Sequence, residues 1–246
     1  MRPVLIAGAN GTLGAAFREV CGSRHLAFLG LSRTELDITD EDAVASALDR
    51  HEPWLVVNAA GYVRVDDAER NPEQCRRDNT LGPALLARCC RQRGVRLLCF
   101  SSDLVFDGQK GAPYEEDDPP APLGVYGLTK VEAERRVLAA CPEALVVRTS
   151  AFFGPWDVHN FVTRTITALL AGRAVRAAAD LTVSPTYLPD LAHACLDLSI
   201  DEARGVWHLT NVGALTWAEL ARTAARLAGL SEDRVSAVPA RALELP

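Results

Sequence analysis

Short apolar runs alternate with helical patterns along the first 150 residues, and this rhythm constrains the fold more than any other feature of the sequence. The runs are continuously apolar and rich in valine and leucine, as in strands that helices cover on both faces. Five such runs are "PVLIAG" (3–8), "LAFLGL" (26–31), "WLVVNAA" (54–60), "VRLLCFSS" (95–102) and "ALVVRTS" (144–150). Strand–helix alternation of this kind predicts an α/β fold with a Rossmann-type, doubly wound parallel sheet.

The segments between these runs have helical spacing and recognisable helix ends. Leu81, Leu85 and Cys89 recur every four residues, which places them on one face of a helix. Gly94 follows where a helix C-cap belongs, and Asp40 is placed to N-cap the helix before the third strand.

Beyond residue 150 the rhythm loosens, which predicts a second, smaller region. We expect residues 1–150 to form a dinucleotide-binding domain. Residues 151–246 should form mostly a small C-terminal substrate-binding lobe, with a part at about 175–200 returning to the first domain. Helices are expected near 160–171, 189–199 and 216–229, and short strands near 174–177 and 205–209.

The segment "LIAGANGTLG" joins the first strand to a helix, with Gly8, Gly11 and Gly14 three residues apart. A tight turn needs positive φ, a pyrophosphate needs close approach of the backbone, and the helix must pack on the sheet. The helix N-terminus offers free N–H groups and a positive dipole end to phosphates. The loop therefore predicts a dinucleotide cofactor, with these contacts: Gly8, Asn10, Gly11, Thr12 and Leu13.

The end of the second strand bears on which cofactor binds. A cofactor without a 2′-phosphate usually meets an Asp or Glu there, which accepts a hydrogen bond from the ribose. This sequence has "LSRTELD", with Ser32 and Arg33 at that place. Arg33 could pair with a 2′-phosphate through charge-assisted hydrogen bonds, or it could simply face solvent. We expect NADP(H) to be preferred, with NAD(H) as the alternative.

Tyr126 and Lys130 begin a predicted helix, and their spacing places both side chains on one face. A free tyrosine has a pKa of about 10, too high for proton transfer near neutrality. A nearby ammonium favours the phenolate and would lower that pKa, as general acid–base catalysis requires. Ser102 ends a strand at the carboxyl edge of the sheet, where ligands bind in open α/β folds. Its hydroxyl could donate to a substrate carbonyl or to the tyrosine oxygen.

Composition excludes several function classes. The formal net charge is −6, which disfavours a nucleic-acid partner. No apolar run reaches the roughly 20 residues of a membrane span. The seven cysteines are odd in number and lack a Cys-x-x-Cys pair, and the five histidines lack ligand spacing. We therefore expect reduced thiols, a cytoplasmic location and no metal site.

Motifs along nearly the whole chain resemble the extended short-chain dehydrogenase/reductase superfamily, and within it dTDP-4-dehydrorhamnose reductase and related sugar-nucleotide reductases. Several motifs in the right order are more specific than any one of them. They are "GANGTLG" (8–14), "ELDITD" (35–40), "NAAGYVRVDDAE" (58–69), "SSDLVFDG" (101–108), "PLGVYGLTK" (122–130), "VVRTSAFFG" (146–154), "NFV" (160–162) and "SPTYLPDLA" (184–192).

The resemblance implies NAD(P)H-dependent reduction of a 4-keto group on a nucleotide-activated deoxysugar, as in dTDP-rhamnose biosynthesis. It implies that Ser102, Tyr126 and Lys130 are catalytic, with Tyr126 as the proton donor. It also implies that Tyr126 and Lys130 contact the cofactor, Lys130 by binding the nicotinamide ribose and tuning the tyrosine. Further cofactor contacts implied are Asp37 and Ile38 at the adenine, Ala59, Ala60 and Gly61 beneath the cofactor, and Asn79. Substrate contacts implied are Val65, Ser102, Asp103, Ala151, Phe152, Asn160 and Phe161. A homodimer is compatible with the resemblance.

The sequence departs from the family pattern where the sugar should bind. Ala151 replaces a common aromatic residue, Leu104 a tyrosine and Val183 a glycine. Trp156 lies in the same region and either contacts the substrate or packs under the loop. Two alternatives stay open: an epimerase or dehydratase of the same superfamily, and a non-catalytic NADP-binding regulatory subunit.

Overall fold

A computed structural model gives the structure of residues 2–155 and 157–243. The chain divides into two compact units. Unit 1 comprises residues 1–149 and 192–209, and unit 2 comprises residues 150–191 and 210–246. The segment that returns to unit 1 is thus 192–209, later than the expected 175–200. The strand at Val175–Ala178 stays in unit 2 because it pairs there with Val235–Val238.

Unit 1 is built on a six-stranded parallel sheet of order β10-β5-β4-β3-β1-β2. The strands are β1 (Val4–Ala7), β2 (Phe28–Leu31), β3 (Leu55–Asn58), β4 (Arg96–Ser102), β5 (Leu145–Thr149) and β10 (Gly205–His208). All five predicted apolar runs contain one of these strands, and the Rossmann-type prediction is confirmed.

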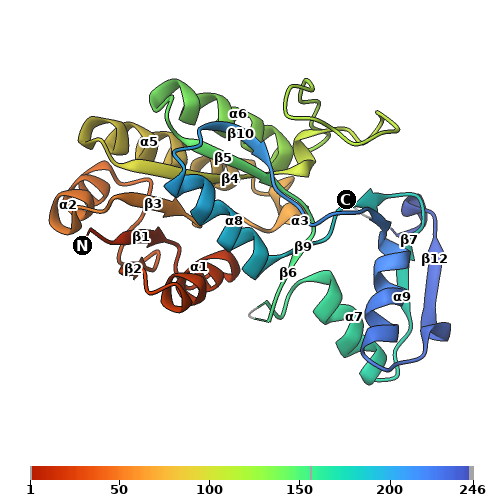
Figure 1. Cartoon of the computed structure of the whole chain (residues 1–246). Coiled ribbons are helices and arrows are strands. Elements are labelled where there is room, and N and C mark those ends of the chain that lie inside the picture. Colours follow the sequence, from red (N-terminus) through yellow and green to blue (C-terminus); the bar gives the residue numbers. More distant parts are fainter. Residues whose placement is uncertain (1, 156, 244–246) are drawn as a thin grey trace. The chain divides into compact units, whose positions relative to one another are not determined.

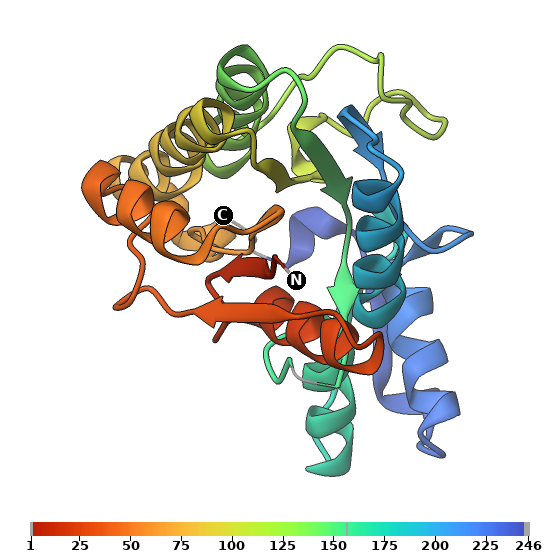
Figure 2. The same cartoon turned by 60° about the vertical axis from the view of Figure 1, so that its left-hand side comes forward.

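Helices cover both faces of this sheet (Figure 1). They are α1 (Thr12–Ser23), α2 (Glu41–His51), α3 (Val65–Ala68), α4 (Pro72–Arg76), α5 (Gly82–Arg93), α6 (Val125–Ala140) and α8 (Leu188–Ile200). The short η1 (Arg77–Leu81) is a π-helix, and η2 (Asp103–Val105) is a 3₁₀ turn. On one face α2, α5 and α6 form a layer (Figure 2), whose core includes Val44, Leu86 and Val137. On the other face Phe17 of α1 packs on Phe100 of β4.

The predicted helix ends are confirmed. The Asp40 carboxylate accepts from the backbone N–H groups of Asp42 and Ala43, at 3.1 and 3.0 Å. Gly94 caps α5 with φ of 61°, a conformation that glycine adopts without steric strain. These local signals fix where the covering helices start and stop.

Unit 2, in its described residues 150–155, 157–191 and 210–243, has short paired strands and two longer helices. Its helices are α7 (Phe161–Leu170), α9 (Trp217–Leu227) and the 3₁₀ turns η3 (Glu232–Arg234) and η4 (Ala240–Ala242). Its strand pairs are β6 (Phe152–Phe153) with β9 (Thr186–Tyr187), β8 (Thr182–Val183) with β11 (Leu215–Thr216), and β7 (Val175–Ala178) with β12 (Val235–Val238). A small core rich in alanine joins them: Leu169, Ala177, Ala218, Ala221, Ala225 and Val235.

Candidate active site

The glycine loop lies where the strand order of the unit 1 sheet reverses, between β1 and β3. Gly8 has φ of +79°, and a Cβ there would lie 2.7 Å from the backbone nitrogen of Ala60. A Cβ at Gly14 would overlap the carbonyl oxygen of Gly8. The two strand-end loops and helix α1 can therefore approach this closely only because these positions are glycine. Ligands of open α/β sheets bind at such a reversal point.

The N-terminus of α1 has the features of a phosphate site. Its N-cap, Gly11, supplies no side-chain hydrogen bond, and the first turn carries no acidic residue. The backbone N–H groups of this turn are thus left for an anion. Asn10 and Gly11 are exposed and Thr12 is half-buried, whereas Leu13 is buried in the core. Of the predicted loop contacts, Leu13 can offer a cofactor only its backbone.

The structure gives Arg33 a partner that the sequence did not indicate. Its guanidinium donates two hydrogen bonds to the Asp78 carboxylate, at 3.0 and 3.1 Å. The Arg33 side chain is therefore partly exposed to solvent and already paired with a carboxylate. Ser32 is also engaged, because its N–H and hydroxyl both donate to Glu35, at 2.8 and 2.6 Å.

Asp37 and Ile38 form the next part of this edge. Asp37 accepts hydrogen bonds from the backbone N–H and hydroxyl of Thr39 and from Arg77. Burial alone would raise the pKa of Asp37, but these bonds outweigh it and hold that pKa below its usual value. Ile38 is 4% exposed. Asp37 is therefore a fixed anion beside a buried apolar side chain.

The loop after β3 is held in place by Asn79 of the π-helix η1. The side-chain oxygen of Asn79 accepts from the Tyr62 N–H at 2.8 Å, and its NH₂ donates to the Tyr62 carbonyl at 3.0 Å. Ala60 donates its N–H to the Asn58 side chain at 3.2 Å. Ala59, Ala60 and Gly61 are thus fixed from two sides. Asn79 is 1% exposed, so its amide supports this loop.

Ser102, Tyr126 and Lys130 lie at the carboxyl end of β4 and the start of α6. Lys130 Nζ donates to the Phe100 carbonyl of β4 at 3.1 Å and lies 5.5 Å from the centre of the Tyr126 ring. Ser102 donates to the Asp103 carboxylate at 3.0 Å and accepts from the Leu104 N–H at 3.2 Å. The three predicted residues therefore share one region of unit 1, with Lys130 bridging strand and helix.

Burial controls the titration of this group in the protein alone. It raises the pKa of Tyr126, and the Asp103 carboxylate and the Cys75 thiol raise it further. Burial also lowers the pKa of Lys130. The expected lowering of the tyrosine pKa by the ammonium is not found in the protein alone, where burial, Asp103 and Cys75 all raise that pKa. Tyr126 is therefore protonated at neutral pH, as a free tyrosine also is, and the protonated phenol is the form that can donate a proton.

Two distant residues fix the helix that carries Tyr126 and Lys130. Glu69 accepts from the Val125 N–H at 2.7 Å and so caps α6 from the loop after α3. One turn beyond Lys130, Glu134 pairs with Arg148 of β5, with contacts of 2.8 and 2.7 Å. Both side chains of this pair are 6–7% exposed. Sequence reasoning missed these contacts because their partners lie far apart in the chain.

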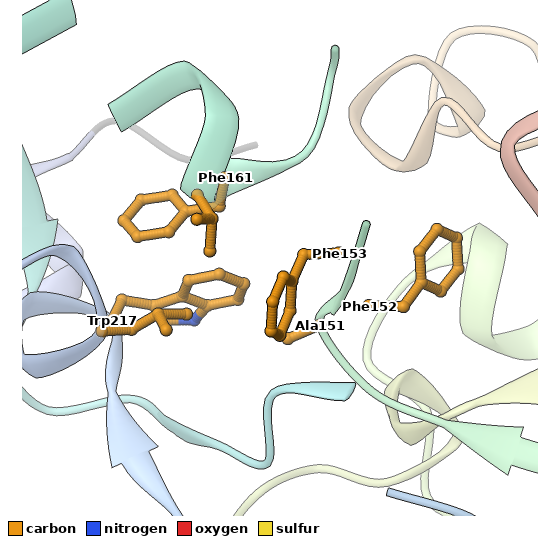
Figure 3. A pocket seen from close by; sticks show the side chains of 7 residues that line it. Ala151, Phe152, Phe153, Phe161 and Trp217 are labelled. Carbon is orange, nitrogen blue, oxygen red and sulfur yellow. The ribbon is translucent and has the colours of Figure 1, made fainter. Parts of the chain in front are cut away.

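Three predicted substrate residues of unit 2, Ala151, Phe152 and Phe161, line a small hollow of about 40 Å³ (Figure 3). The Phe161 and Trp217 rings pack edge to face, with ring centres 4.7 Å apart, and Phe153 points toward this pair. Phe152 points to the other side of its strand, and Ala151 has φ of 38°. Aromatic and aliphatic side chains make up most of the lining of the hollow.

The other predicted substrate residues have different surroundings. Asn160 is buried and N-caps α7, accepting from the Thr163 N–H at 2.9 Å and donating to the Asp157 carbonyl at 2.6 Å. Val65, the first residue of α3 in unit 1, is 40% exposed and open to a ligand. Trp156 lies outside the described residues.

Other expectations of the sequence concern metals, thiols and membranes. Among residues 2–155 and 157–243, no group of three or more His, Cys, Asp or Glu side chains is placed to hold a metal ion. All seven cysteines are free and buried. Burial raises the pKa of Cys99 to about 12. No helix in the described part of the chain has the length and apolar character to cross a membrane.

Comparison with known proteins identifies the family. A model of the RmlD substrate binding domain matches residues 1–246. The chain belongs to this family. A dTDP-4-dehydrorhamnose reductase of Streptomyces griseus is 38% identical over 248 residues, covering 98% of this chain and 81% of the relative. A dTDP-4-keto-6-deoxy-D-glucose reductase of Streptomyces niveus is 35% identical, covering 96% and 82%.

A solved structure agrees with the family assignment. The dTDP-4-dehydrorhamnose reductase of Bacillus anthracis, in complex with NADP, matches with a TM-score of 0.95 and 28% identity. The match covers 99% of this chain and 86% of that one. The resemblance read from the sequence motifs is confirmed.

Proposed function

We propose that this chain reduces the 4-keto group of a dTDP-activated deoxysugar, with NADPH as the hydride donor. One observation carries the proposal: Ser102, Tyr126 and Lys130 lie together at the carboxyl edge of a sheet whose strand order reverses at the glycine loop. The relatives named as dTDP-sugar reductases support the substrate class.

The residues present fit the dinucleotide. The α1 N-terminus and the Gly8 turn would hold its pyrophosphate, and the edge formed by Arg33, Asp37 and Ile38 would hold its adenosine. When bound, NADPH supplies the hydride that the carbonyl carbon accepts. The NADP-bound structure of the Bacillus anthracis relative supports this choice of coenzyme.

The chain's own residues supply the proton and the orientation. The Ser102 hydroxyl can donate to the carbonyl oxygen and polarise it. Tyr126, which is protonated at neutral pH, gives its proton to that oxygen as the alcohol forms. Lys130, 5.5 Å from the ring centre, then stabilises the phenolate left behind. We place this reaction in the cytoplasm because all seven cysteines are free thiols.

The proposal is tested by incubating the protein with a dTDP-4-keto-6-deoxy sugar and NADPH. The loss of reduced-nicotinamide absorbance measures turnover. Tyr126→Phe should lower kcat by roughly 10²- to 10⁴-fold because it removes the proton donor. Coenzyme affinity should change little in this variant. Tyr114→Phe is the matched control, since Tyr114 stacks on Phe106 with ring centres 4.1 Å apart and has no proposed role in the chemistry.

The result also separates the alternatives. Tight NADPH binding without turnover of any keto-sugar nucleotide would favour a non-catalytic, cofactor-binding subunit. Product that keeps the keto group, with no net consumption of NADPH, would favour an epimerase or dehydratase. The expected homodimer stays a prediction, which analytical ultracentrifugation tests.

A further inference from the structure

Four charged side chains of alternating sign line the edge of unit 1 that the adenosine would occupy. Arg33 pairs with Asp78, Asp78 lies 3.7 Å from Arg77, and Arg77 pairs with Asp37 at 2.9 Å. The two positive and two negative charges cancel. This edge therefore offers a phosphate dianion much less attraction than the presence of two arginines would indicate.

Asp78 is the fixed member of this row. Its side chain is 7% exposed, and it accepts a third hydrogen bond from Gln74 at 2.7 Å. Its neighbour Asn79, in the same π-helix, fixes the loop after β3. Insertions of π-helix occur frequently at functional sites. Here η1 supplies an inward-facing carboxylate and an inward-facing amide from consecutive residues.

Arg33 is the exposed member of the pair. Its side chain is 59% exposed, and its two bonds to Asp78 use Nη1 and Nη2. The Nε edge lies outside this pair and could still meet a ligand oxygen. A ribose 2′-phosphate that reaches this guanidinium must share it with a carboxylate of the same sign as itself.

We propose that Asp78 sets the coenzyme selectivity of this site, acting through Arg33 as a built-in carboxylate that competes with the ribose 2′-phosphate. The chain then binds NADPH only modestly better than NADH. The inference rests on the proposed function for the location of the adenosine. It makes Asp78 a specificity-determining residue that need not touch the coenzyme.

Binding to the protein without substrate tests the inference directly. Dissociation constants for NADPH and NADH are measured by reduced-nicotinamide fluorescence, and 2′,5′-ADP and 5′-ADP serve as nicotinamide-free probes in calorimetry. Asp78→Asn removes the charge with almost no change of shape. It should raise the selectivity for the 2′-phosphorylated ligand of each pair about three- to tenfold, through tighter binding of that ligand alone.

The acid and the arginine should depend on each other. In an Arg33→Ala background, Asp78→Asn should change selectivity by less than about twofold. Asp78→Glu retains the charge and should stay near the wild-type selectivity. Glu132→Gln is the matched control: it breaks a two-bond pair with Arg76, at 3.2 and 3.0 Å, and should leave selectivity unchanged.

NADPH binding by Arg33→Ala gives a second test, which does not depend on whether the Asp78→Asn variant folds. Because Arg33 already shares its charge, Arg33→Ala alone should weaken NADPH binding by less than about fivefold. A loss of more than about thirtyfold would show that the arginine is fully available to the phosphate and would overturn the inference. Unchanged or reduced selectivity in folded Asp78→Asn would overturn it as well.

The outcomes also separate this inference from the proposed function. A selectivity change without keto-sugar turnover would support the role of Asp78 and contradict the reductase. Turnover with NADPH but no selectivity change in Asp78→Asn would support the reductase and contradict the role of Asp78. Failure to bind any of the four ligands would contradict both.

Discussion

The two units of this chain are stabilised by different kinds of contact. Unit 1 has a six-stranded sheet, and buried polar pairs such as Glu134–Arg148 tie its helices to its strands. Unit 2 has strand pairs, a small alanine-rich core and helices with side-chain caps at Asn160 and Thr216. The comparison indicates that unit 1 depends more on contacts between residues distant in the sequence, such as Glu134–Arg148. Unit 2 depends more on contacts within one helix turn, such as its helix caps.

The largest expected effect is in the buried ion pair of unit 1. Glu134→Gln leaves the Arg148 guanidinium buried without its counter-charge, and should lower the free energy of unfolding by about 3–5 kcal/mol. Urea unfolding measures it. Glu143→Gln is the control, because Glu143 and its partner Arg91 are more than half exposed, and it should change little. A loss as small in Glu134→Gln as in the control would break the comparison.

A smaller effect is expected at the glycine loop. Gly14→Ala would place a Cβ into the backbone of Gly8 and Ala9, and should destabilise unit 1 by about 1–3 kcal/mol and weaken coenzyme binding. Thermal unfolding and a coenzyme titration measure both changes. Gly22 lies in the same helix, and a Cβ there would have no neighbouring atom within 4 Å, so Gly22→Ala should stabilise by up to about 1 kcal/mol. Equal behaviour of the two variants would contradict the close approach of the loops.

In unit 2 the corresponding test is a helix cap. Thr216 and Glu219 form a capping box at the start of α9, so Thr216→Ala should cost about 1 kcal/mol. Hydrogen exchange of the first-turn amides of α9 measures this loss locally. Thr223→Ala makes the same chemical change inside α9 and should not destabilise it. A loss of several kcal/mol at Thr216 would show that unit 2 also depends on exacting contacts.

The smallest effect is a pH-dependent one at Glu132. Hydrogen bonds from Arg76 lower the pKa of Glu132, and a hydrogen bond and the positive charge of Arg136 lower it further. Together these effects outweigh burial, which would raise that pKa. A carboxyl with a lowered folded-state pKa contributes stability above its unfolded pKa of about 4.3, and this stability is lost as pH falls through the folded-state pKa. Glu132→Gln should therefore be slightly less stable than wild type at pH 7 and equal to it near pH 2. A difference that persists in acid would contradict this assignment.

Much of unit 1 could be predicted from the sequence. The apolar runs predicted its first five strands, Asp40 and Gly94 marked helix ends, and the glycine spacing marked the glycine loop. These features are local, because each depends on residues within one turn or one strand. The same reasoning located Tyr126 and Lys130 on one helix face.

The contacts of the candidate site could not be predicted in this way. Arg33 and Asp78 are 45 positions apart, and no periodicity connects them. The π-helix that presents Asp78 and Asn79 has no residue pattern that sequence reasoning recognised. In unit 2, the contact of Asn160 with substrate stays a prediction, and the structure adds that its amide caps α7. Phe161 was expected near substrate, and it packs against Trp217, 56 residues beyond it.

The sequence by itself determined the strand–helix order, the turn at Gly8, Gly11 and Gly14, and the placement of Tyr126 and Lys130 on one helix face, because local propensity and spacing encode these properties. Only the tertiary structure decided that Asp78 engages Arg33, that Glu134 engages Arg148 and that burial raises the pKa of Tyr126. The physical reason is that ion pairing and desolvation depend on which distant segments the closed chain brings together and on how completely it excludes water.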